Sequence, residues 1–184
     1  MNKNVHLRYI MRLIELIGAL DRWDRSGIWA FSSNTLAMIF PESDRTRLKA
    51  LSDHANAGVI AHISRGLYIN PRAKSLPADL LAALVPFLRP WAFNYLSLES
   101  ALSEAGFISQ IPSRLTVMTT GRRQTFETDF GTIEFVHTEQ SIESLKLQVK
   151  WDGRRRLAIA TPDRAMADLK RVGRNVNLLS IEDF

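Results

Sequence analysis

Four residues that can bind a polyanion lie together in one short segment, at Arg45, Thr46, Arg47 and Lys49. Arginine can donate two parallel hydrogen bonds to guanine O6 and N7, and lysine or threonine can bind bases or phosphates. Neighbouring segments offer donors of the same kind, at Ser33, Asn34, Thr35 and Arg65. These residue types favour binding to nucleic acid, provided that the fold brings them to one surface.

The pattern of residues 43–58 predicts a helix that positions the first group. Ser43 is a good N-cap, and Gly58 is a good C-terminal cap. At helical spacing one face is apolar and is expected to pack on preceding helices, through Leu48, Leu51 and Ala55. The opposite face carries Thr46, Lys49 and Asp53, with Arg45 and Arg47 beside the first turn. This distribution is typical of a recognition helix that enters the major groove of DNA.

Two further helices are predicted before this one. Apolar residues recur at helical spacing in the first, at Ile10, Leu13, Ile14, Ile17 and Leu20. The second is short and covers residues 35–40, with Ser33 or Asn34 as its N-cap and Pro41 after it. Backbone N–H groups at its start are able to bind a phosphate.

A β-hairpin is predicted after the third helix. The β-prone runs 59–63 and 67–69 are joined by a loop that contains Arg65 and Gly66. Three helices followed by a hairpin is the order of a winged helix-turn-helix. Residues 1–76 are therefore predicted to be a DNA-binding domain, with Arg65 on the wing. The alternatives are a solvated helix with ordinary surface arginines and a winged helix that binds another protein.

The distribution of charge agrees with this prediction. Residues 1–76 hold 11 of the 24 basic and 6 of the 19 acidic residues, whereas residues 77–184 hold 13 of each. The whole formal excess of +5 therefore lies in the first segment. A localised basic field is the expected footprint of a module that binds a polyanion.

The second part of the chain is predicted to be a mixed α/β domain over residues 77–184, which makes the whole protein α+β. Two prolines and no apolar period mark the boundary at residues 70–78. Pro77 is expected to open a helix that Pro86 kinks or ends. Further helices are predicted at residues 97–106 and 161–173, and strands at residues 115–120, 124–127, 132–137 and 157–160.

Two basic turns in this domain are candidate contacts for RNA, for DNA phosphates or for an acidic partner, at Arg122, Arg123, Arg154, Arg155 and Arg156. Solvated turns are the favoured alternative. His137 lies near Glu134 and Glu139 but has no second histidine at ligand spacing, so a surface role is favoured. No phosphate loop, nucleophile motif or metal-ligand pattern occurs. We expect no catalytic residue, metal or cofactor, and hence no enzyme.

Composition excludes several classes of protein. The chain has 184 residues, of which 46% are hydrophobic, so one or two domains with real cores are expected. It has no cysteine, which excludes a disulfide framework and a thiolate zinc site. No apolar run reaches the roughly 20 residues of a membrane span, and the start lacks the pattern of a signal peptide. We expect a cytoplasmic protein that does not enter a membrane.

Four segments resemble the AbiEi family of antitoxins and transcriptional regulators from type IV toxin–antitoxin systems. They are GLYINP (66–71), YLSLESALSEAGFISQIPSRLTVMTTGRR (95–123), FGTIEFVH (130–137) and IATPDRAMADLKR (159–171). The resemblance implies an N-terminal winged helix that binds inverted repeats in its own promoter and represses transcription. It implies a C-terminal domain needed for antitoxin activity or interaction. It also implies a linked toxin that looks like a nucleotidyltransferase, without a stable antitoxin–toxin complex.

Three functions remain open from the sequence. The first is an autorepressor that also serves as an antitoxin, with a dimer on its inverted-repeat operator as one arrangement. The second is a stand-alone regulator, because longer members of the family continue with further helices where residues 172–184 follow here. The third is an enzyme that processes nucleic acid, with Asp129, Glu134 and Lys146 as an unspecific set of candidate residues.

Overall fold

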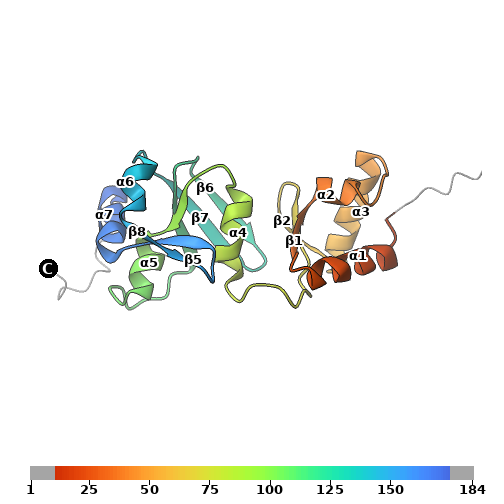
Figure 1. Cartoon of the computed structure of the whole chain (residues 1–184), viewed down its shortest axis with the longest axis horizontal. Coiled ribbons are helices and arrows are strands. Elements are labelled where there is room, and N and C mark those ends of the chain that lie inside the picture. The colour runs from red at the N-terminus through yellow and green to blue at the C-terminus, as the bar shows by residue number, and fades with distance from the viewer. Residues whose placement is uncertain (1–10, 175–184) are drawn as a thin grey trace, which may run out of the picture. The chain divides into compact units, whose positions relative to one another are not determined.

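The computed structural model describes residues 11–174, and it is a mixed α+β fold (Figure 1). In this described part there are seven helices and two sheets. The chain divides into two compact units between Leu76 and Pro77, and each is considered by itself. Ile10 of the predicted first helix and the segment 175–184 lie outside the described residues.

The N-terminal unit combines three helices with one small sheet. Its elements are α1 (Leu13–Arg25), β1 (Ala30–Ser32), α2 (Ser33–Ala37), α3 (Asp44–Asn56), β2 (Ala61–Ser64) and β3 (Leu67–Ile69). The predicted helices and hairpin are present, and Gly66 has the positive φ that the hairpin turn requires. Strand β1 was not predicted. It pairs antiparallel with β3, which places β3 at the centre of the sheet.

The core of this unit differs from the predicted one along α1. Leu16, Ala19 and Leu20 are buried, together with Met11 before the helix, whereas Leu13 and Ile14 are 48% and 77% exposed. The apolar residues of α1 form two stripes, and the sequence pattern alone does not say which stripe faces inward. The buried one packs on Phe31, Leu36, Leu51 and Ile60, which come from β1, α2, α3 and the start of the hairpin.

The caps of α2 and α3 are set by serines. The Oγ of Ser43 accepts a hydrogen bond from Thr46 N at 3.3 Å, as predicted for an N-cap. For α2 the prediction of Ser33 or Asn34 was wrong by one or two positions. Ser32 is the cap, and its Oγ accepts from Thr35 N at 3.1 Å.

The C-terminal unit is built on a six-stranded mixed sheet. Its elements are α4 (Leu80–Leu88), β4 (Asn94–Leu96), α5 (Leu98–Glu104), β5 (Arg114–Thr119), β6 (Gln124–Thr128), β7 (Gly131–His137), α6 (Ile142–Lys146), β8 (Val149–Asp152), β9 (Leu157–Ala160) and α7 (Pro162–Val172). The strand order is β6-β7-β5-β4-β9-β8, with the β5–β7 and β4–β9 pairs parallel. Strands β4 and β8 and helix α6 were not predicted.

Helices cover both faces of this sheet (Figure 1). Helix α4 contacts β4, β7 and β9, while α5 and α7 pack together over β5 and β9. Neighbouring residues of a strand point to opposite faces. Accordingly, Phe135 of β7 faces the chain just after α4, and Glu134 faces Arg174 just after α7.

The predicted start of α4 was wrong, whereas the predicted ends of α7 are present. Pro77 does not open α4, because Asp79 caps it by accepting from Ala82 N at 3.2 Å. Pro86 lies inside the last turn of α4, and the helix ends two residues later. The prediction for α7 is confirmed. Thr161 is its N-cap, and Gly173 ends it in the left-handed conformation, φ 71°.

Candidate nucleic-acid interface and C-terminal pocket

Seven residues of α3 are exposed: Asp44, Arg45, Leu48, Lys49, Ser52, Asp53 and Asn56. Four of them, Arg45, Leu48, Lys49 and Ser52, lie together at helical spacing and are here called the α3 face. Leu51 is fully buried beneath them. This face includes two predicted binding residues, but it is rotated from the one expected. Leu48 was predicted to pack in the core and is instead 52% exposed. An exposed leucine between an arginine and a lysine can contact the methyl group of thymine.

Arg47 takes the inward position that Leu48 was expected to fill. Its Nη1 donates to the carbonyl oxygen of Glu42 at 3.1 Å, and its Nη2 donates to the Asp44 carboxylate. These partners allow the aliphatic stem to pack inside while both terminal nitrogens of the guanidinium are bonded. The buried Nε of Arg47 has no hydrogen-bond partner among the described residues. Arg47 therefore holds the start of α3 in place, and its donors are not directed to solvent.

The other predicted binding residues of α3 make weaker contacts within the protein than Arg47 does. The Thr46 hydroxyl lies 2.8 Å from Ser43 Oγ and takes part in the cap. Lys49 is exposed and makes a 3.4 Å ion pair with Asp53, which is also exposed. Such a surface pair is worth at most about 1 kcal/mol, so a phosphate can replace it. Arg45 is exposed at the first turn of the helix.

The start of α2 and the tip of the hairpin meet. Ser33 N donates to the carbonyl oxygen of Gly66 at 3.0 Å. This bond places Ser33 beside the turn that carries Arg65, which is exposed. Asn34 is exposed one residue further along α2, and Thr35 is half-buried. The structure thus brings two of the predicted groups together, although the backbone N–H groups of Ser33 and Thr35 are already bonded.

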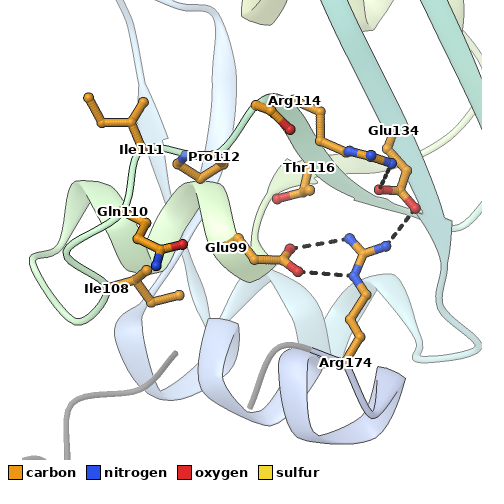
Figure 2. A pocket seen from close by; sticks show the side chains of 10 residues that line it. Glu99, Ile108, Gln110, Ile111, Pro112, Arg114, Thr116, Glu134 and Arg174 are labelled. Atoms are coloured by element: carbon orange, nitrogen blue, oxygen red, sulfur yellow. Dashed lines mark hydrogen bonds and ion pairs between the residues drawn. The ribbon is translucent and has the colours of Figure 1, made fainter. Parts of the chain in front are cut away.

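A pocket of about 500 Å³ lies in the C-terminal unit, beside α5, the start of β5 and the middle of β7. Figure 2 shows that Arg174 reaches between two carboxylates on its floor. Its Nε and Nη2 donate to the two oxygens of Glu99 at 3.0 and 3.2 Å, and its Nη1 donates to Glu134 at 2.6 Å. Arg114 approaches Glu134 from the other side at 3.5 Å. The rim is largely formed by Ile108, Gln110, Ile111, Pro112 and Ser113.

The charges in this pocket are mutually compensated. Burial of Glu134 opposes its ionisation, but the hydrogen bond and charge of Arg174, with those of Arg114, keep its pKa below the ordinary value. Burial also disfavours the charged form of Arg174, yet its two glutamate partners raise its pKa. The pocket was not predicted, because Glu99 and Arg174 are 75 positions apart in the chain.

The two predicted basic turns differ in their environment. Arg155 pairs with Asp79 at 2.8 Å and with Glu104 at 2.7 Å, and so it links the β8–β9 turn to α4 and α5. The side chains of Arg122, Arg123, Arg154 and Arg156 are exposed.

The residues considered for catalysis are not gathered in the pocket. Glu134 lines it, whereas Asp129 and Lys146 do not. The Nδ1 of His137 lies 2.7 Å from the carbonyl oxygen of Gly121. Within residues 11–174 no group of three or more histidine, aspartate or glutamate side chains is arranged to hold a metal ion.

A buried polar cluster supports the pocket from behind. Tyr95 and Ser97 donate to the Asp168 carboxylate at 3.0 and 2.8 Å, and Arg164 pairs with it at 2.6 Å. Burial and the charge of Asp168 raise the pKa of Tyr95. Tyr95, Ser97 and Arg164 all bond to the Asp168 carboxylate, so the cluster fixes α7 on the sheet.

The comparisons with known proteins add no family. Neither the protein-family models nor the curated protein sequences contain a match to this chain. Across the described helices, none has the length and apolar character needed to cross a membrane.

Proposed function

We propose that the N-terminal unit is a winged helix that binds duplex DNA and that the protein is a transcriptional repressor. The observation that carries the proposal is the exposed face of α3, where Arg45, Leu48 and Lys49 stand next to one another. In the major groove the same three side chains have partners: guanine, thymine methyl and phosphate.

Three further features support duplex DNA as the ligand. Helix α2 contacts α3, as the two helices of a helix-turn-helix do. The hairpin β2–β3 follows α3 and presents Arg65, which suits a wing on the phosphate backbone. The whole formal charge excess of the chain lies in residues 1–76. A local excess of positive charge supplies the sequence-independent part of DNA affinity.

The role of the C-terminal unit is proposed from the resemblance to the AbiEi family. We propose that the protein represses its own promoter at an inverted repeat, as a cytoplasmic antitoxin of a type IV system. The partner in that role is a nucleotidyltransferase-like toxin, with no stable complex between the two proteins. A stand-alone regulator is the alternative, and the gene adjacent to this one distinguishes them.

The test compares the operator with a scrambled duplex. The operator is found by footprinting the protein on DNA upstream of its own gene, and affinities are then measured for both duplexes. If Arg45 contacts a base, Arg45→Ala should weaken operator binding by about 1–3 kcal/mol and scrambled binding much less. Lys150→Ala, which removes an exposed lysine of the other unit, is the matched control and should bind both duplexes like the wild type.

Two results would contradict the proposal. The first is an equal loss on both duplexes, which would make Arg45 a phosphate contact without sequence preference. The second is wild-type affinity in a combined Arg45→Ala, Lys49→Ala variant that is folded, which would mean that α3 is not the recognition helix.

A second candidate function is a carboxylate-dependent reaction on nucleic acid. The observation that favours it is the pair Glu99 and Glu134 facing each other across the floor of the pocket. Against it stands Arg174, which occupies the space between them and pairs with both. Because Arg174 pairs with both carboxylates, we propose the non-enzymatic role.

A further inference from the structure

A loop and a turn of the C-terminal unit meet at the sheet. The loop, residues 89–93, follows α4, and the turn, residues 120–123, joins β5 to β6. Phe93 N donates to Thr120 Oγ1, and Thr120 N donates to the carbonyl oxygen of Phe93, both at 3.0 Å. A Cβ built on Gly121 would lie 3.2 Å from the Cβ of Ala92. The two segments therefore form one surface, here called the Trp91–arginine surface and defined by Arg89, Trp91, Arg122 and Arg123.

Arg89 joins the loop to the turn. Its Nη2 donates to Gln124 Oε1 at 2.5 Å and to the carbonyl oxygen of Arg122 at 3.5 Å. Its Cζ lies 5.1 and 5.2 Å from the ring centroids of Phe126 and Phe135. All of these partners are neutral. Burial and the nearby charge of Arg122 lower the pKa of Arg89, so the positive charge at this place is not compensated.

The two arginines of the turn add to that charge. Arg122 and Arg123 are exposed. Within the described residues, no carboxylate forms an ion pair with them or with Arg89. The contrast with Arg155 and Arg174 is informative, because each of those binds two or more carboxylates. Three cations in adjacent segments without an internal anion indicate an anion from outside the chain.

Trp91 provides a different kind of contact on the same surface. Its side chain is 97% exposed. The loop around it is nevertheless ordered by Asn94, whose Nδ2 donates to the carbonyl oxygens of Arg89 and Ala92 at 2.9 and 3.0 Å. An indole held in water on a fixed loop offers a flat face to a ligand, and nucleic-acid bases stack on such faces.

We infer that the Trp91–arginine surface binds single-stranded nucleic acid, with a base stacked on Trp91 and phosphates on Arg122 and Arg123. An acidic polypeptide would satisfy the arginines but would have no use for the indole. A double helix hides the faces of its bases and so would not use Trp91 either. The site is separate from the α3 face, so it does not depend on the function proposed for the N-terminal unit.

The test uses the full chain carrying Arg45→Ala and Lys49→Ala, so that α3 contributes little. Dye-labelled oligomers of uridine and of thymidine, about 12 nucleotides long, and a duplex of equal length are titrated by fluorescence anisotropy. Adding Trp91→Ala should weaken single-strand binding by about tenfold or more, while Trp91→Phe should retain most of it. Adding Arg122→Ala and Arg123→Ala should make the negative slope of log K against log salt shallower by about 1.4.

The chain offers matched controls in the same unit. Trp151→Ala removes a tryptophan that is 68% exposed on β8, and Lys150→Ala removes an exposed lysine of the same strand. Neither should change single-strand binding. A preference for the uridine or the thymidine strand assigns RNA or DNA, and equal binding means that the sugar is not recognised; each of these agrees with the inference.

Three outcomes overturn it. In the first, Trp91→Ala binds single strands as tightly as its parent. In the second, Trp151→Ala loses as much affinity as Trp91→Ala, which would make the effect nonspecific. In the third, polyglutamate displaces the oligomers at the same charge concentration, which would assign the surface to an acidic protein partner.

Discussion

Replacing Arg174 by alanine should selectively destabilise the C-terminal unit at neutral pH. The guanidinium makes three hydrogen bonds to Glu99 and Glu134, and both carboxylates are at least nine-tenths buried. Removing one partner of a buried ion pair typically costs about 3–5 kcal/mol. Here the guanidinium is 28% exposed and the pocket admits water, so we expect about 2–3 kcal/mol.

The loss should depend on pH in a defined direction. The pKa of Glu134 is lowered in the folded protein, so the ion pair contributes stability above the carboxyl's ordinary pKa of 4.5. That contribution disappears as the pH falls through the lowered pKa. Without Arg174, Glu134 loses the hydrogen bond and the charge that lower its pKa. The difference in unfolding free energy between wild type and variant should therefore be largest at pH 7 and should shrink toward pH 4.

The assay is urea denaturation of the full chain at pH 7 and at pH 4, followed by hydrogen exchange of the backbone amides of the C-terminal unit. Tryptophan fluorescence is not suitable, because Trp91 and Trp151 of this unit are 97% and 68% exposed when it is folded. Arg154→Ala is the control, since its guanidinium is exposed and its loss should change the unfolding free energy by less than about 0.5 kcal/mol. An Arg174→Ala variant as stable as this control at pH 7 would show that the reasoning is wrong. A loss of the same size at both pH values would assign the effect to packing of the side-chain stem instead of charge.

Three shorter predictions follow from the site. Arg47→Ala should lower the unfolding free energy of the N-terminal unit by about 1–3 kcal/mol, because it removes a buried hydrogen-bond donor, and should leave the DNA affinity of the folded fraction unchanged; a sequence-dependent loss of affinity would contradict this. Arg65→Ala should weaken operator and scrambled duplexes alike and make the slope of log K against log salt shallower by about one unit, which a salt titration measures. The purified protein should show no nuclease or nucleotidyltransferase turnover with added divalent metal, and activity that Glu134→Gln abolishes would refute that expectation.

Helix limits were predicted well where a side chain caps the helix locally. The caps of α3 and α7 bond to backbone groups only a few residues away, as Ser43, Thr161 and Gly173 do. Such local bonds can be predicted from the sequence alone. Strands β1, β4 and β8 were missed because three or four residues carry little pattern of their own. Each exists through pairing with a distant partner, as Ala30 pairs with Ile69.

In the candidate sites, too, local features were predictable from the sequence and long-range ones were not. The exposure of Arg45, Lys49 and Arg65 was predictable from helical spacing and from a turn. The burial of Arg47 and the exposure of Leu48 were not predictable. Hydrophobic periodicity assigns leucine to the core and ignores the hydrogen bonds available to an arginine. The Glu99–Arg174–Glu134 pocket and the Trp91–arginine surface depend on segments brought together by the sheet, which no local spacing reveals.

The position of β9 within the sheet has a consequence for how the protein is made on the ribosome. This strand separates β4 from β8, so residues 157–160 must leave the ribosome before β4 has its parallel partner. The N-terminal unit is complete at Leu76. At translation rates of about 5–20 residues per second, roughly 4–17 s pass between these two points. During that interval the edge of β4 that later pairs with β9 is unpaired. An unpaired strand edge can bind a chaperone or pair with a strand of another chain and so aggregate.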